Sequence, residues 1–234
     1  MLASSVVDSP LSCWSGGHVW TSAHVLADYL NRKTIRKMIC NTSLPDRRAQ
    51  VLELGSGCGL LGLAAMVLGG KVTLTDQTMQ LPLLRMNAKY NHRRLERAEI
   101  ERHGESTCPC PQVKELIWGQ APSPPDKSLK GYDLVLGSDL FYIPGQAVNF
   151  TATLLSIFHT ARALGQQNPP LVLLAHGTRA DSFHNSFFEE FEKASLTINT
   201  VSTVEHDKEQ DMRNVTSIYE ISFPLYDTCL SEVL

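Results

Sequence analysis

The sequence predicts an α/β fold built on a doubly wound, mainly parallel seven-stranded sheet with an antiparallel edge hairpin. Short apolar runs typical of buried strands alternate with segments whose apolar residues recur at helical spacing. The alternation stops near the end of the chain, where "INTVSTVE" and "TSIYEISF" follow one another without a helical segment between them. Two such runs in succession indicate a hairpin at the edge of the sheet.

Periodicity, and the residues that interrupt it, place the individual elements. Pro82 is tolerable only in the first turn of its helix, because proline lacks the amide proton that later turns need. A polar connector with Pro45 and Asp46 follows the first helix, and the proline-rich stretch 121–131 is expected to be a surface connection. We expect helices at 18–33, 58–68, 79–100, 147–164 and 183–194, and strands at 51–54, 71–75, 113–118, within 132–142, 170–177, 198–205 and 216–223.

Length and composition are those of one globular domain. The chain has 234 residues, enough to bury a substantial core. We expect a monomer and a single domain, with a short leader at 1–17, an N-terminal helix at 18–33 and the core at 50–223. The formal net charge is −3, so no overall basic excess points to nucleic acid, which would need a local basic patch.

The six cysteines are scattered along the chain. Cys108 and Cys110 lie close together, but no second pair stands at zinc-finger spacing, so we expect a loop and no metal site. The N-terminal stretch has no signal-peptide pattern, and no stretch reaches the roughly 18 apolar residues that a membrane span needs. We therefore expect free thiols, no membrane association and a cytoplasmic location, with the nucleus as the alternative.

The stretch "VLELGSGCGLLGLAAMVLGGKVTLTD" joins a strand, a glycine turn, a helix and a second strand that ends in Asp76. Gly55 and Gly57 can adopt backbone angles closed to other residues, and they let a ligand approach the start of the helix. Asp76 ends the next strand, where a carboxylate can accept both ribose hydroxyls of an adenosine. A dinucleotide site would place its third glycine at position 60, which is Leu60, and no lysine follows Gly62 as a phosphate-binding loop requires.

The spacing E-x-G-x-G-x-G, from Glu53 to Gly59, closely resembles the S-adenosylmethionine turn of the Rossmann-like class I methyltransferases. "GGHVWTSAHVLADYL", "MNAKYN", "LIWG" and "GSDLFY" stand in the order seen in the methyltransferase-16 family of seven-β-strand protein lysine methyltransferases. That family modifies chaperones, an ATPase and translation elongation factors. The resemblance spans roughly residues 16–223. It implies an enzyme that uses S-adenosylmethionine to methylate a lysine of a specific non-histone protein, possibilities being a chaperone, ATPase or translation factor.

The resemblance also assigns roles to single residues. Glu53 begins the glycine motif, and Asp139 and Tyr142 match the family's D-x-x-Y motif at the reaction centre. The other implied cofactor contacts are Trp20 as an aromatic neighbour, Gly55, Ser56 and Gly57 under the methionine part, Asp76 at the ribose, Trp118 beside the adenine, and Ser138 at the end of the fourth strand.

Each of these residues has a purely structural alternative. Trp20 on an apolar helix face and Trp118 at a strand end could both be core residues. Asp139 could cap a helix. Asn87 and Asn91, four residues apart, are expected on a solvated helix face, and His176 is expected in a loop after the fifth strand rather than as a base.

Two other functions remain open from the sequence. The acceptor could be an arginine, a histidine or a nucleic-acid base, and "KYNHRRLER" supplies basic residues for the last of these. Three glutamates follow directly, which makes nucleic acid the less favoured partner. The chain could also be a catalytically silent adaptor that keeps the cofactor fold as a docking platform, although the intact Asp76, Asp139 and Tyr142 argue against it.

Overall fold

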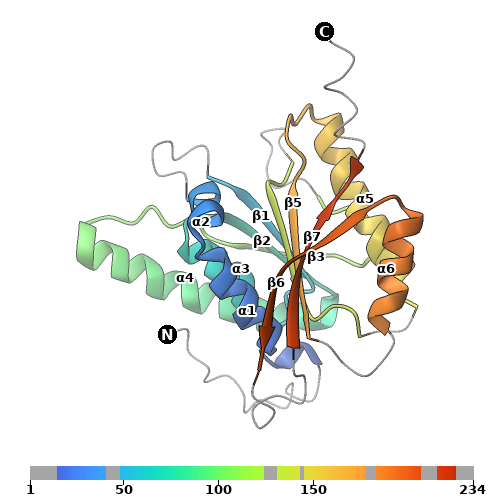
Figure 1. Ribbon diagram of the computed structural model, residues 1–234. Coiled ribbons are helices and arrows are strands. Elements are labelled where there is room, and N and C mark those ends of the chain that lie inside the picture. Colours follow the sequence, from blue (N-terminus) through green and yellow to red (C-terminus); the bar gives the residue numbers. More distant parts are fainter. Residues whose placement is uncertain are drawn as a thin grey trace.

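A seven-stranded sheet forms the centre of the protein (Figure 1). The structure is a computed structural model, and it describes residues 15–40, 48–123, 131–142, 145–177, 183–206 and 215–224. The strands are β1 (Gln50–Leu54), β2 (Lys71–Asp76), β3 (Gln112–Glu115), β4 (Leu134–Ser138), β5 (Leu171–Gly177), β6 (Thr197–Glu205) and β7 (Val215–Ser222). Their order in the sheet is β3-β2-β1-β4-β5-β7-β6.

The pairing confirms the predicted fold class. β1, β2, β3, β4 and β5 pair in parallel with their neighbours in this group, whereas β7 runs antiparallel to both β5 and β6. β1 pairs with β2 on one side and with β4 on the other, so the direction in which the sheet grows reverses between β1 and β4. Ligands of doubly wound sheets bind at the carboxyl ends of the strands beside such a reversal.

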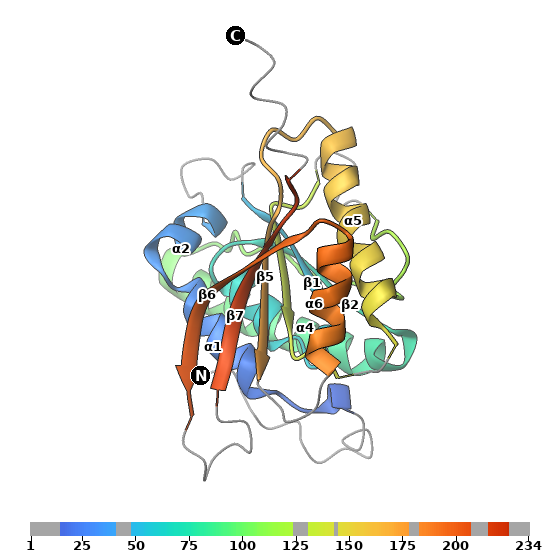
Figure 2. The same cartoon turned by 45° about the vertical axis from the view of Figure 1, so that its right-hand side comes forward.

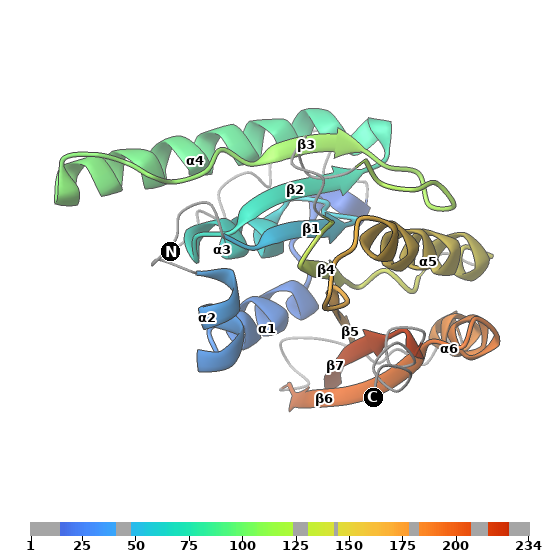
Figure 3. The same cartoon turned by 90° about the horizontal axis from the view of Figure 1, so that it is seen from above.

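Helices cover both faces of the sheet, as Figure 3 shows from above. One buried cluster packs α1, α2, α3 and the start of α4 against one face, and the other packs α5 and α6 against the opposite face. α5 and α6 lie side by side (Figure 2). The helices are α1 (Thr21–Leu30), α2 (Lys33–Ile39), α3 (Leu60–Val67), α4 (Leu81–His103), α5 (Ala147–Ala163) and α6 (Phe183–Lys193).

A cluster of phenylalanines joins the loop after β4 to α5 and α6. The ring of Phe141 lies 4.5 Å from that of Phe187 and 6.0 Å from that of Phe150, between centroids. Phe150, Phe187 and Phe191 are fully buried. Aromatic pairs at these distances add to the stabilisation that burial supplies. The cluster therefore holds the segment that directly follows Asp139.

Three element predictions were wrong in part. α2 was not predicted; its side chains are mostly polar, but Ile39 is fully buried and anchors it. The first helix is shorter than 18–33 and begins only at Thr21. β3 ends at Glu115 rather than at Trp118, because its single neighbour β2 ends at the register partner Asp76.

Other predictions are confirmed or lie outside the described residues. Pro82 stands in the first turn of α4, as proline requires. Pro45, Asp46 and most of the proline-rich connection at 121–131 lie outside the described residues. Among the helices that the structure describes, none combines the length and the apolar character of a membrane span.

Replacing Phe187 by alanine tests the aromatic cluster. Phe187→Ala should lower the free energy of unfolding by about 3–5 kcal/mol, the cost of emptying a buried aromatic site. Urea denaturation measures this loss of stability. Val148→Ala, at a position of α5 that is 61% exposed, is the control and should change stability by less than about 0.5 kcal/mol. A loss below about 1 kcal/mol for Phe187→Ala would contradict the role of the cluster.

Candidate active site

A cavity of about 370 Å³ opens at the carboxyl ends of the parallel strands. Ligand sites for small molecules have volumes of roughly 300–1,000 Å³. All ten of the site residues predicted from the sequence line this one cavity: Trp20, Glu53, Gly55, Ser56, Gly57, Asp76, Trp118, Ser138, Asp139 and Tyr142.

The glycine turn after β1 has no space for side chains. Gly55 and Gly57 have φ angles of 59° and 52°, in the left-handed region that favours glycine. A Cβ atom on Gly57 would lie 3.2 Å from the carbonyl oxygen of Gly16, and one on Gly55 would lie 2.6 Å from Leu140 Cδ2. The bare backbone of this turn therefore forms part of the cavity wall.

Asp76 ties the end of β2 to the glycine turn. Its Oδ2 accepts a hydrogen bond from the Gly57 amide at 2.7 Å, and its Oδ1 accepts one from the Gln77 amide at 2.8 Å. Burial raises the pKa of Asp76, and the two amide hydrogen bonds act in the opposite direction. A carboxylate has about four acceptor positions, so each oxygen retains capacity for one further donor. Two neighbouring hydroxyls are donors of that kind.

Ser56 forms a second link between the turn and β2. Its amide donates to the Thr75 carbonyl at 2.9 Å, and its Oγ accepts from the Thr75 amide at 3.0 Å. The Thr75 hydroxyl in turn donates to the Glu53 carbonyl at 2.6 Å. The side chain of Ser56 is thus engaged with protein, and its contribution to the cavity wall is structural.

Glu53, the penultimate residue of β1, carries a buried carboxyl, and 2% of the residue's surface is exposed. Its Oε2 accepts from the Gly62 amide, in the first turn of α3, at 3.1 Å. Burial raises the pKa of Glu53 to about 8, with hydrogen bonds from Ser56 and Gly62 acting against it. Glu53 therefore carries a proton at neutral pH and caps the helix in its neutral form.

Asp139 directly follows β4 and is 4% exposed. Its φ angle is 52°, a left-handed conformation that costs a non-glycine residue about 1–3 kcal/mol. Two hydrogen bonds to β5 hold it there: its amide donates to the Ala175 carbonyl at 2.9 Å, and its Oδ1 accepts from the Gly177 amide at 3.0 Å. The next helix, α5, has Gln146 at its N-cap position, so Asp139 is not a helix cap.

The three aromatic residues occupy loops beside the cavity. Trp20 precedes α1 at the N-cap position, so the prediction that it lies on a helix face was wrong. Trp118 lies in the turn after β3 rather than in the strand, and its ring meets that of Phe150 edge-on, with centroids 4.9 Å apart. Trp118 therefore contacts both the core and the cavity. Tyr142 is half-buried and lines the cavity.

Three residues that line or support the cavity were missed or misplaced in the prediction from the sequence. Gly16, at the end of the expected leader, lines the cavity and accepts a hydrogen bond from Cys58 Sγ at 3.4 Å. Asn87 is buried rather than solvated, because its Nδ2 donates to the Cys58 carbonyl in the glycine turn at 3.0 Å. Its neighbour Asn91 donates to the Asn87 carbonyl.

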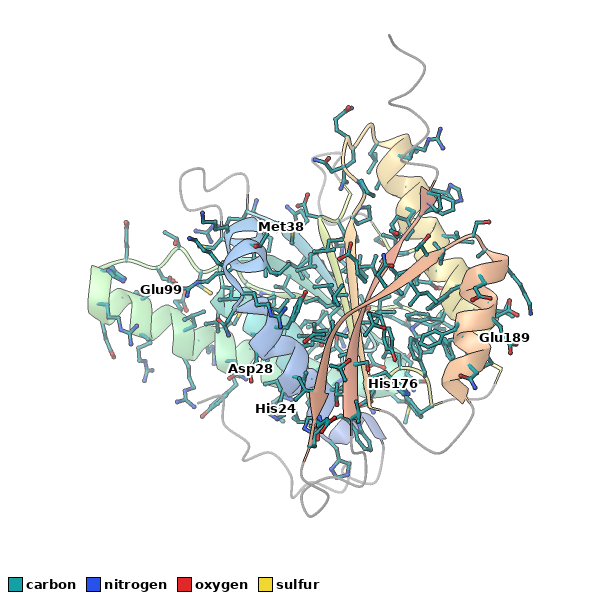
Figure 4. The ribbon with its side chains drawn as sticks, in the orientation of Figure 1. His24, Asp28, Met38, Glu99, His176 and Glu189 are labelled. Carbon is teal, nitrogen blue, oxygen red and sulfur yellow. The ribbon has the colours of Figure 1, made fainter. Side chains whose placement is uncertain are left out.

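His176 is the third, and the prediction that it lies in a loop was wrong. It is the penultimate residue of β5 (Figure 4) and is 4% exposed. Its Nδ1 lies 3.5 Å from Asp139 Oδ1. Its position at the end of the apolar run "PLVLLAHG" is the feature of the sequence that could have placed it in the strand.

Metal chemistry has no visible site in the part of the chain that the structure describes. There, no three histidine, cysteine, aspartate or glutamate side chains gather as metal ligands would. Cys108 and Cys110 lie in the loop between α4 and β3, as expected. Together with Cys40 and Cys58, they are free thiols.

Two solved structures have the same fold. A glycopeptide N-methyltransferase, MtfA, complexed with S-adenosylmethionine, has a TM-score of 0.53 at 11% identity and covers 87% of each chain. Magnesium protoporphyrin IX methyltransferase from Synechocystis PCC 6803, with bound S-adenosylhomocysteine, has a TM-score of 0.51 at 12% identity, over 86% of this chain and 81% of that one. At such identities the likeness concerns the fold alone.

Sequence comparison identifies the family. Protein N-lysine methyltransferase METTL21A of Mus musculus is 32% identical over 194 residues, which cover 83% of this chain and 73% of that protein. Protein-lysine N-methyltransferase EFM6 of Saccharomyces cerevisiae is 29% identical over 199 residues, 78% of this chain and 73% of that protein. The Methyltransf_16 family, described as lysine methyltransferase, matches residues 9–194. The chain belongs to this family of lysine methyltransferases.

Proposed function

We propose that the cavity at the strand ends binds S-adenosylmethionine and that Asp139 and Tyr142 present a lysine of a specific non-histone protein to it. As a family member, the protein is an S-adenosylmethionine-dependent protein-lysine methyltransferase. The proposal adds the roles of individual residues. The observation that carries it is the convergence of the glycine turn, Asp76 and Asp139 on one cavity.

The residues around the cavity suit this cofactor. The bare turn at Gly55 and Gly57 lets a ligand approach the backbone, and we assign it to the methionine part. The spare acceptor positions of Asp76 suit the two ribose hydroxyls. Trp118 is assigned to the adenine. The remaining assigned contacts are Trp20, Glu53, Ser56 and Ser138, of which Glu53 and Ser56 act by shaping the turn.

The reaction places two demands on the protein. The bound cofactor supplies a sulfonium methyl group that an amine displaces in line, so the amine must be neutral and aligned. Removing the proton from a lysine at neutral pH costs about 4–5 kcal/mol. We propose that Asp139 attracts the incoming ammonium and orients the amine after the proton leaves to solvent. Tyr142 closes the channel and offers a cation–π contact.

The acceptor is proposed to be a protein of the kind that the family modifies: a chaperone, an ATPase or a translation factor. The printed names of METTL21A and EFM6 support a protein lysine as acceptor. We further propose that the enzyme acts as a monomer with one methyltransferase domain, in which 50–223 is the catalytic core and 18–33 closes one side of the cavity.

A nucleic-acid base is the second candidate acceptor, and one observation favours it. Lys89, Arg93, Arg94 and Arg97 are exposed on α4, where they form a local basic patch on a chain of net charge −3. Glu101 borders the same surface and weakens its attraction for phosphate. Binding that weakens steeply with rising salt would support the nucleic-acid acceptor.

Labelling of a whole-cell extract with radioactive S-adenosylmethionine tests the function. Wild type should label a discrete protein band on lysine, whereas Asp139→Asn should lower the labelling rate at least about 100-fold, because the charge that holds the ammonium is lost. Asparagine keeps an acceptor for the Gly177 amide, so affinity for the cofactor should change by less than about threefold.

Mass spectrometry of the labelled material separates the alternatives. Label found on arginine, histidine or nucleic acid would show that this group, and not lysine, is the acceptor. Cofactor binding with no labelling in any extract would favour the silent adaptor. Full labelling by Asp139→Asn would remove the role proposed for that carboxylate.

The ribose assignment is tested by Asp76→Ala. Affinity for S-adenosylmethionine, measured by calorimetry, should fall at least about 100-fold, since two hydrogen bonds to a charged group are lost. The free energy of unfolding should fall by about 1–3 kcal/mol, because the partly buried Gly57 amide loses its acceptor. Asp28→Ala, an exposed aspartate on α1 (Figure 4), is the control and should leave both unchanged. Wild-type affinity in Asp76→Ala would refute the assignment.

The raised pKa of Glu53 predicts a dependence of stability on pH. The folded protein keeps the proton up to about pH 8, whereas the unfolded chain loses it near 4.5, so stability should fall as the pH rises between these values. Glu53→Gln keeps the acceptor for Gly62 but cannot ionise. Its stability relative to wild type should therefore increase by a few kcal/mol, on the order of 1.4 per pKa unit, from pH 5 to pH 8.

Thermal unfolding of both proteins across this pH range measures the difference. Glu189→Gln, at an exposed carboxylate on α6 (Figure 4), is the matched control and should follow the wild-type curve. Parallel curves for wild type and Glu53→Gln would show that Glu53 is ionised in the folded protein.

A further inference from the structure

His176 is a buried imidazole immediately behind the cavity. It lies on the same face of β5 as Val172 and Leu174, which belong to the core beneath α5 and α6. Its register partner on the antiparallel neighbour is Ser217. The ring is 4% exposed and does not line the cavity, so any influence on a bound ligand passes through a neighbour.

That neighbour is Asp139. The backbone of Asp139 is held by the Ala175 carbonyl and its Oδ1 by the Gly177 amide, and these two residues flank His176 in the chain. The Asp139 carboxylate therefore lies beside the carboxyl end of β5, next to the imidazole of His176. His176 Nδ1 lies 3.5 Å from the same Oδ1 that accepts from Gly177. Both neighbours thus approach one edge of the carboxylate.

Phe141 holds the imidazole from a second side. Its ring lies 5.1 Å from that of His176 at an interplanar angle of 49°, and it is itself packed against Phe187. The rotamer of His176 is therefore restrained by the aromatic cluster. A donor on a restrained ring can fix the orientation of a carboxylate better than one on a mobile side chain.

We propose that His176 is a positioning residue for Asp139: its Nδ1, 3.5 Å from Oδ1, closes by a few tenths of an ångström to donate Nδ1–H to Oδ1 and sets the orientation in which the carboxylate meets the lysine amine. The inference rests on the role proposed above for Asp139. Two donors on Oδ1, the Gly177 amide and the imidazole, would fix the plane of the carboxylate. Orientation at this point matters, because a displacement of about 1 Å in a reacting group costs roughly 100-fold in rate.

Nuclear magnetic resonance of protein labelled with ¹⁵N-histidine tests the hydrogen bond without any acceptor protein. Neutral His176 should be the Nδ1–H tautomer in wild type, and its ring signals should shift in Asp139→Asn. An Nε2–H tautomer with an unprotonated Nδ1 would overturn the proposal. Because no methyl transfer is measured, this result stands apart from the success or failure of the proposed function.

Two matched variants test the consequence for transfer. His176→Asn places an amide donor near the position of Nδ1, and His176→Phe keeps an aromatic ring without a donor. With radiolabelled S-adenosylmethionine and a dilution series of whole-cell extract, His176→Phe should lower the labelling rate at saturating extract at least about tenfold. His176→Asn should retain it within about threefold.

Calorimetry separates positioning from a general structural effect. Affinity for S-adenosylmethionine should be unchanged in both variants, since His176 does not touch the cavity. Equal loss of labelling in the two variants, or a parallel loss of cofactor affinity, would overturn the proposal. If His176→Phe fails to fold, the proposal is tested by the tautomer of His176 in the wild type and by the labelling rate of His176→Asn. Wild-type protein that labels no lysine would contradict the proposed function and leave the tautomer result intact.

Discussion

The hydrogen bond from the Gly57 amide to the Asp76 carboxylate is the contact on which the rest of the site depends. It joins the turn after β1 to the end of β2, and the pair of hydrogen bonds between Ser56 and Thr75 reinforces it. A turn with left-handed backbone angles has few contacts of its own, so these links determine where it lies. The position of Asp76 and the shape of the glycine turn are therefore a single structural feature.

Buried or half-buried carboxyl groups at the strand ends are the second common feature of the site. Glu53 is the penultimate residue of β1, Asp76 ends β2 and Asp139 directly follows β4, and each accepts at least one backbone amide hydrogen bond. Burying such groups is costly unless they are hydrogen-bonded or neutral. Glu53 meets the requirement by keeping a proton, and the other two rely on amides. A wall of this kind favours positively charged ligands, among them a sulfonium and a lysine ammonium.

The sequence was sufficient for the fold and for bringing the candidate site residues to one cavity, because both follow from local pattern. Alternating strands and helices predict the sheet, and residues at the carboxyl ends of parallel strands meet at one edge. Ser138 and Asp139 could be chosen on that ground. The glycine spacing added the class of ligand.

What the sequence could not show depends on contacts between distant segments. Asn87 is buried only because the Cys58 carbonyl, 29 residues earlier, lies within its reach. His176 meets Asp139 because β4 and β5 are neighbours in the sheet, which no periodicity reveals. Trp118 likewise lies outside β3, because β3 ends at Glu115, opposite the end of β2 at Asp76.

A crystal structure of the protein with S-adenosylhomocysteine would test the proposed site most directly. The ribose hydroxyls should lie within hydrogen-bond distance of both Asp76 oxygens, with the adenine against Trp118 and the sulfur facing Asp139 and Tyr142. The hydrogen bond between Gly57 and Asp76 should persist. A ligand bound elsewhere, or a ribose that does not contact Asp76, would contradict the proposed arrangement.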